Sequence, residues 1–213
     1  MGGRGSSAGG GGGGGSVAGI ISERPMSNER ETALGMRKQI DQVLTVSRDV
    51  SDQYGVVPDD ILIAKMKGGA KNGTLAYYSG GSNSIAVNEA YMTTGMDQDY
   101  DRCVQSGFHP SRGNKSAMEA VAAHELGHML TYEAMNRATN FNDAIAPADG
   151  IVRRAAKASG MGIRALQKSI SGYATHNYKE TVAEAFADVY CNGSKASKGS
   201  LAVVSQLNKF YGK

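Results

Sequence analysis

From Ala33 to Tyr54, apolar residues recur at every third or fourth position, broken only by Ser47, which is the spacing of a helix with one buried face. Asn28 and Glu31 stand in capping-box spacing just after Pro25, which is typical of a helix start. We therefore expect a long amphipathic helix that ends near Tyr54 and serves as scaffold. Its predicted apolar face consists of Ala33, Met36, Ile40, Val43, Val50 and Tyr54.

The second half of the chain holds a stronger helical pattern with a clear start. Ser116 and Glu119 form an S-x-x-E capping box, which predicts a helix from Ala117 to about Met135. Further helices are predicted over 151–159, 163–170 and 177–190, and the pattern over 200–210 is compatible with another. The predicted shared core consists of Met118, Ala122, Leu126, Leu130, Val182, Phe186 and Val189.

Short apolar runs between the first two helices predict strands. The runs at 61–66 and 75–78 are separated by a glycine- and lysine-rich turn. Over residues 84–91, the larger side chains of Ile85, Val87, Glu89 and Tyr91 alternate with the smaller ones of Ala86, Asn88 and Ala90. This alternation predicts a third strand, at an edge of the sheet. The polar stretches 94–115 and 138–150 are expected to be loops. The fold class that follows is α+β, with a small, largely antiparallel sheet packed on the capped helix.

Composition divides the chain into a tail and one domain. Residues 1–25 are rich in glycine and serine, and 11 of the 29 glycines lie within the first 19 residues. Such a segment has little apolar surface to bury, so we expect a flexible tail or tether. The remaining residues, 26–213, are enough for one ordinary domain.

Charge and cysteine content bear on the class of function. With 23 basic and 20 acidic side chains and no tryptophan, the chain lacks the basic, aromatic-rich surface of a nucleic-acid-binding protein. No apolar run approaches the length of about 18 residues that a membrane span needs, and the first residues do not resemble a signal peptide. The two cysteines, Cys103 and Cys191, are too few for a disulfide framework, although a single bridge between them is compatible with the sequence. We expect a cytoplasmic protein with no nucleic-acid and no membrane partner.

The residues with the clearest chemical meaning are His124-Glu125-Leu126-Gly127-His128, an H-E-x-x-H motif inside the capped helix. Residues four apart lie on one face of a helix, so the imidazoles of His124 and His128 can converge on one metal ion. Glu125 lies at the edge of that face, where it can take a proton from water without binding the metal. The opposite side of the helix carries Ala122, Leu126, Met129 and Leu130.

Random shuffling of this composition, which includes only 4 histidines, produces the motif roughly 0.003 times. The alternative explanation, a helix with two surface histidines and an ordinary glutamate, is therefore the weaker one. A zinc enzyme also needs a third protein ligand and an open position for water. The extended motif with a third histidine is absent, because Ala134 stands at that position, and the remaining histidines are His109 and His176.

A later helix offers acidic candidates for the third ligand. Glu180, Glu184 and Asp188 follow one another at four-residue steps, and such carboxylates repel one another unless a positive group lies opposite. A metal ion with its histidines would supply that group. A solvated acidic face explains the same spacing, and so does a role for Glu180 as the cap partner of Asn177. The residues alone leave Glu180 and Glu184 both open as the ligand.

The H-E-x-x-H motif, followed some tens of residues later by a helix that carries a glutamate, resembles the gluzincin family of zinc metallopeptidases. More closely, the segment from Ser171 to Phe186 looks like the catalytic domain of anthrax lethal factor. It is also similar to small zincin-like proteins encoded by phages and prophages, among them minor head proteins, which share the glycine-rich opening. The resemblance of the motifs covers roughly residues 116–190.

This resemblance implies a zincin-like fold and roles for particular side chains. His124, His128 and Glu180 would bind one Zn²⁺ ion, and Glu125 would be the general base. Tyr173, seven residues before Glu180, would stabilise the oxyanion or protonate the leaving amine.

Two more positions belong to the same expectation. Glu184 would hold a ligand histidine in the tautomer that binds metal. His176 departs from the family pattern. It would compete as a ligand, contact the substrate, or be a solvated loop residue.

The function that these residues imply is that of a zinc-dependent endopeptidase, which hydrolyses peptide bonds with a metal-activated water and Glu125 as base. Its partner would be a protein or peptide substrate, bound as an added strand along residues 84–91. One alternative is a phage structural or assembly protein with a non-catalytic zinc site. Another is a narrow regulatory protease that acts on a repressor-like target. The phage resemblance adds a virion or host protein as a candidate partner, and virion association as a candidate location.

Overall fold

A computed structural model gives the structure of the protein over residues 30–68, 73–92 and 96–213. The predicted tail, residues 1–25, and the predicted helix start at Asn28 lie outside the described residues. The first helix is α1 (Arg30–Tyr54), and it ends where the sequence predicts. Its described apolar face from Ile40 to Tyr54 is buried, as expected for a scaffold helix.

Three short strands form a mixed sheet in the order β1-β3-β2. β1 (Asp60–Ala64) runs parallel to β3 (Ser84–Asn88), whereas β2 (Ala76–Ser79) is antiparallel to β3. The expectation of a largely antiparallel sheet is therefore wrong. β1 and β2 follow one another in the chain but are not neighbours in the sheet, because the chain crosses from one side of β3 to the other between them.

β3 is the central strand, so the prediction of an edge strand over 84–91 is wrong. All five residues of β3 are buried, because β1 and β2 cover its edges and the core covers its faces. The chain then leaves the sheet in a short 3-10 helix, η2 (Glu89–Tyr91). A substrate cannot add to a strand that is already paired on both sides. Among the described residues, no strand pairs with the edge of β2 that faces away from β3.

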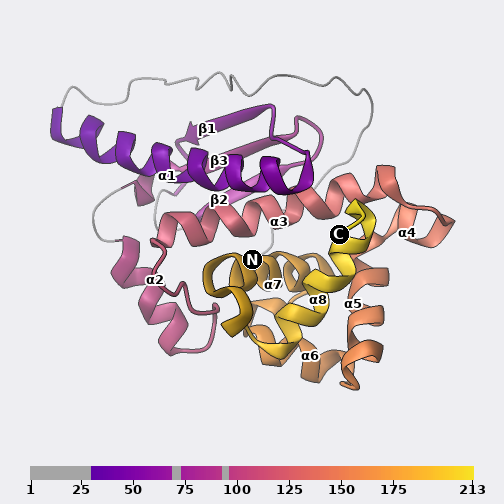
Figure 1. The fold of residues 1–213 in the computed structure, drawn as a ribbon. Coiled ribbons are helices and arrows are strands. Elements are labelled where there is room, and N and C mark those ends of the chain that lie inside the picture. Colours follow the sequence, from indigo (N-terminus) through magenta and orange to yellow (C-terminus); the bar gives the residue numbers. More distant parts are fainter. Residues whose placement is uncertain (1–29, 69–72, 93–95) are drawn as a thin grey trace.

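The helix with the H-E-x-x-H motif, α3 (Ala117–Arg137), passes through the middle of the molecule. It contacts α1 and β2 on one side and the C-terminal helices on the other (Figure 1). The C-terminal half comprises α4 (Phe141–Ile145), α5 (Pro147–Ser159), α6 (Ile163–Ile170), η3 (Tyr173–Thr175), α7 (Tyr178–Asn192), η4 (Gly193–Lys195), α8 (Lys198–Asn208) and η5 (Lys209–Tyr211). The α+β class is thus confirmed.

Two segments expected to be loops contain helix. α2 (Met96–Gln105) lies within 94–115, and it buries only Met96 and Tyr100, so its apolar pattern is too sparse to stand out. α4 lies within 138–150, and α5 begins at Pro147 rather than at 151. Proline is favoured in the first turn of a helix, where its missing N–H has no partner to lose.

Six of the seven predicted core residues are buried, and Val189 is only partly buried. No helix of the described residues is long and apolar enough to cross a membrane.

The contact between α3 and α7 is the most extensive one between any two described elements. It depends on a close approach at Gly127. A Cβ atom placed on Gly127 would lie 2.9 Å from Ala183 Cα and 3.1 Å from Phe186 Cβ. Because the first of these neighbours is backbone, it cannot move aside without moving the helix. Gly127 therefore sets how closely the two helices pack.

We expect Gly127→Ala to destabilise the protein. Overpacking a close contact costs about 1–3 kcal/mol, and the better helix propensity of alanine returns only about 1 kcal/mol. The melting temperature should therefore fall by several degrees in a thermal scan. Gly162→Ala is the control for the loss of a glycine without a clash, because nothing lies within 4 Å of the added Cβ and φ is −68°. Gly162 is the N-cap of α6, so this control should cost at most about 1 kcal/mol. A Gly127→Ala variant as stable as the wild type would contradict the close approach.

Candidate metal centre

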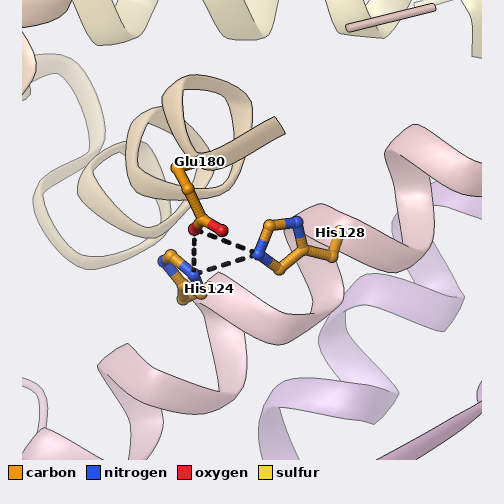
Figure 2. Close-up of side chains that lie close together, drawn as sticks. All are labelled: His124, His128 and Glu180. Atoms are coloured by element: carbon orange, nitrogen blue, oxygen red, sulfur yellow. Dashed lines mark hydrogen bonds and ion pairs between the residues drawn. The ribbon is translucent and has the colours of Figure 1, made fainter. Parts of the chain in front are cut away.

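Local capping places the candidate ligands on α3 and α7. The Ser116 hydroxyl accepts the Glu119 N–H at 3.2 Å, and the Glu119 carboxylate accepts the Ser116 N–H at 2.7 Å, so the predicted capping box begins α3. At the start of α7, the Asn177 side chain accepts the backbone N–H of Glu180 at 2.9 Å. The Glu180 side chain takes no part in this cap and extends toward α3 (Figure 2).

Three side chains from the two helices converge on one point (Figure 2). Nε2 of His124 and Nε2 of His128 are 3.1 Å apart. Glu180 Oε2 lies 3.2 Å from the first of these nitrogens and 3.3 Å from the second. The three side chains are between 13% and 19% exposed, so solvent reaches the cluster. The structure therefore brings together the three residues that the sequence predicts as ligands.

The size of this triangle suits a tetrahedral ion. Nitrogen and oxygen ligands about 2.0–2.2 Å from a tetrahedral Zn²⁺ are about 3.3–3.5 Å apart, only slightly more than the distances here. In addition, Glu180 Oε2 is buried and receives no hydrogen bond. A buried carboxylate oxygen without a donor is costly unless a cation faces it. The donor set and its geometry both fit a metal ion.

The charge of Glu180 agrees with this arrangement. Burial alone would raise the pKa of its carboxyl group, but the imidazoles of His124 and His128 hold that pKa well below the ordinary range. Glu180 is therefore a carboxylate at neutral pH, which is the form that binds a metal.

Glu184 lies on the other side of the His124 ring and is 2% exposed. Its Oε1 accepts a hydrogen bond from His124 Nδ1 at 2.9 Å. Burial raises the pKa of Glu184, but hydrogen bonds from His109 and His124 more than offset this and lower the pKa to about 2. The carboxylate can only accept, so His124 carries a proton on Nδ1, and in its neutral form it presents the lone pair of Nε2 to the cluster. Of the two glutamates that the sequence leaves open, Glu180 is the one within the cluster.

Glu125 is buried, 5% exposed, and lies beside β2. Burial raises the pKa of its carboxyl group, and the two histidines and the backbone N–H of Tyr78 lower it in part. It is not a member of the three-residue cluster. It thus stands next to the ligands without being one, as the position of the motif predicts.

Tyr173, at the start of η3, faces the cluster with its ring 5.9 Å from that of His124. Burial, together with the carboxylates of Glu180, Glu125 and Glu184, raises the pKa of its hydroxyl to about 12. At neutral pH the hydroxyl is therefore protonated and can donate a hydrogen bond.

Two other candidate residues lie outside the cluster. His176 is exposed and packs on Tyr173 at 4.8 Å, so it contacts the wall of the site and is not one of the three clustered residues. Asp188 is bonded to the start of α8 and not to the cluster, because its Oδ2 accepts the Ser197 N–H at 2.9 Å and the Ser200 hydroxyl at 2.6 Å.

No role for His109 or Ser171 follows from the sequence analysis above, yet both donate to the carboxylate of Glu184. His109 Nδ1 lies 3.1 and 3.2 Å from its two oxygens, and Ser171 Oγ lies 2.7 Å from Oε2. The only sequence signal for His109 is that histidines are rare in this chain, since there are 4 in all.

The chain matches no family model, no curated protein and no solved structure. Its likeness to zinc metallopeptidases therefore rests on its motifs and on the arrangement of the cluster.

We expect the purified chain to bind one divalent metal ion, measured by elemental mass spectrometry after dialysis. His128→Ala should lower the affinity by more than about 100-fold, because loss of an outer partner alone costs 10–100-fold. His176→Ala is the matched control, since it removes a histidine next to the cluster and should leave the metal content unchanged. Equal metal in wild type and His128→Ala would rule out this ligand set.

Metal binding should also release a proton. Burial by itself lowers the pKa of His124, but the carboxylates of Glu180 and Glu184 raise it well above the ordinary value of 6.5. The metal-free protein at pH 7 therefore holds a proton that must leave, because only neutral imidazole binds a metal. The apparent affinity should fall as the pH is lowered. Calorimetry in buffers of different ionisation enthalpy measures the release, and heats independent of the buffer would contradict it.

Proposed function

We propose that the protein is a zinc-dependent endopeptidase that uses Glu125 as general base. The observation that carries the proposal is the triangle of His124, His128 and Glu180 with a buried glutamate directly beside it. Two neutral imidazoles and one carboxylate make up the kind of donor set that catalytic zinc sites use. When bound there, Zn²⁺ acts as a Lewis acid that makes water a nucleophile near neutral pH.

Glu125 has the placement that a general base needs. It accepts a proton from water as the water attacks the scissile carbonyl, and it returns that proton to the departing nitrogen. The backbone N–H of Tyr78 and the neighbouring ligands hold its carboxylate in place. Because it is 5% exposed, few solvent molecules compete for the proton.

Tyr173 supplies a hydrogen-bond donor on the opposite wall. Its protonated hydroxyl is suited to stabilise the oxyanion that develops on the substrate, or to protonate the leaving amine. The Tyr173 ring packs on the rings of His176, Phe108 and His109, with centroid distances of 4.8, 5.2 and 5.4 Å.

The free edge of β2 offers a place for an extended substrate. The Asn88 N–H donates to Leu75 O at 2.9 Å, so residues 75, 77 and 79 direct their backbone groups toward β3. Tyr78 then directs its N–H away from β3, in agreement with the contact between this N–H and Glu125. A peptide added along this edge would run past the proposed base. This strand replaces residues 84–91 as the candidate for strand addition.

The number of ligands favours catalysis over a structural role for the metal. Structural zinc sites have four protein ligands, whereas the cluster among the described residues has three. Three ligands leave a position open for water. A structural or assembly protein of a phage would have no use for that position or for Glu125.

Glu125→Gln tests the proposal. The variant should retain zinc, because Glu125 is not a ligand, and should lose about 10²- to 10⁴-fold in peptidase activity, because it cannot accept a proton. Glu133→Gln, the same change on the same helix outside the cluster, is the matched control and should cleave normally.

Cleavage should be followed by mass spectrometry, both on a peptide library and on folded proteins, because a narrow regulatory protease acts on one target. Glu125→Gln cleaving as fast as wild type would overturn the assignment of the base. A zinc-loaded wild type that cleaves nothing in either set would favour a metal-binding structural or assembly protein.

A further inference from the structure

The carboxylate of Glu184 has more hydrogen-bond partners than it needs to orient His124. It is buried, and its two oxygens accept from three side chains: His124, His109 and Ser171. His109 comes from the segment between α2 and α3, far from α7 in the chain. A carboxylate that held His124 alone would not need a second imidazole at 3.1 and 3.2 Å.

We propose that His109 is a positioning residue of the metal centre, which fixes the ring of His124 through the carboxylate of Glu184. This inference rests on the proposed function, since it takes His124 to be a metal ligand. A carboxylate held by one histidine alone can rotate about its side-chain bonds. Donors from His109 and Ser171 fix the remaining lone pairs, so that Oε1 stays directed at His124 Nδ1.

The segment that carries His109 also holds the other wall of the site. Gly107 O accepts the Gly172 N–H at 2.7 Å, and Phe108 O accepts the Tyr173 N–H at 3.0 Å. A Cβ on Gly172 would lie 3.2 Å from Gly107 O, so the two backbones are in close contact. One segment thus anchors both a ligand histidine, through His109, and the backbone of Tyr173.

The His109 ring also packs on the rings of Tyr100, Phe108 and Tyr173, and this packing gives the competing explanation. The ring stacks on Tyr100 with the ring centroids 5.4 Å apart and the planes 6° from parallel. If this packing were its role, any flat ring would replace it. If the hydrogen bond were its role, a donor at the same position would replace it.

Two substitutions separate these explanations. His109→Phe keeps a ring to stack on Tyr100 and removes the donor. His109→Asn removes the ring and keeps a donor, because the side-chain amide nitrogen of asparagine is as many bonds from Cα as Nδ1 of histidine. His109→Gln places its donor one bond further out, where it misses Glu184.

The readouts are the affinity of the full chain for Zn²⁺, measured by competition with a chelator, and the visible spectrum of the Co²⁺-loaded chain. His109→Phe and His109→Gln should bind Zn²⁺ about tenfold more weakly and shift the Co²⁺ bands, whereas His109→Asn should stay close to wild type. His176→Asn, which removes a neighbouring imidazole without touching Glu184, should leave both unchanged.

The inference is overturned if His109→Phe binds as tightly as wild type, or if His109→Asn is as weak as His109→Phe. Melting of the metal-free variants identifies any that fail to fold. If His109→Phe is one of them, the comparison of Asn with Gln decides. A wild type that binds no Zn²⁺ would remove the proposed function as well. If the wild type binds Zn²⁺ and cleaves peptides, and His109→Phe binds Zn²⁺ equally well, only this inference is overturned and the proposed function stands.

Discussion

The close packing of α3 against α7 is the constraint on which the candidate site depends. The two histidines come from one helix and the carboxylate from the other, so the distances among them follow from how near the helices lie. Gly127 stands between His124 and His128 and faces the backbone of Ala183, which makes that nearness possible. The residue that permits the contact thus lies within the motif that supplies the ligands. A larger side chain there would disturb the packing and the site together.

Around this contact the chain gathers more negative charge than a protein interior ordinarily holds. Glu125, Glu180 and Glu184 are all largely buried, and all three carboxylates raise the pKa of the same imidazole, that of His124. Burying one carboxylate costs free energy, and burying several near one another adds repulsion. Hydrogen bonds from His109, Ser171 and His124 offset this for Glu184, but Glu180 Oε2 has no donor. A positive charge beside Glu180 therefore balances the cluster, either as protonated His124 in the metal-free protein or as a bound metal ion.

Local sequence signals predict part of this arrangement. The spacing of His124 and His128 is a property of any helix, and the capping box fixes where that helix begins. Which glutamate of α7 reaches the histidines depends on how α7 is rotated in the core, and that is a tertiary property. The order of strands depends on a crossover that no turn residue specifies. His109 meets Glu184 only because the chain between α2 and α3 folds over the start of η3. Contacts of this kind leave no periodic trace in the sequence.

The chain between His128 and Glu180 holds α4, α5, α6 and η3, and none of the described residues of these helices is a member of the cluster. The length of chain between the two motifs is therefore not what brings the ligands together, because the packing of α3 on α7 does. A search for other proteins with this arrangement should compare the relative placement of two helices and a tyrosine, and not the interval between two motifs.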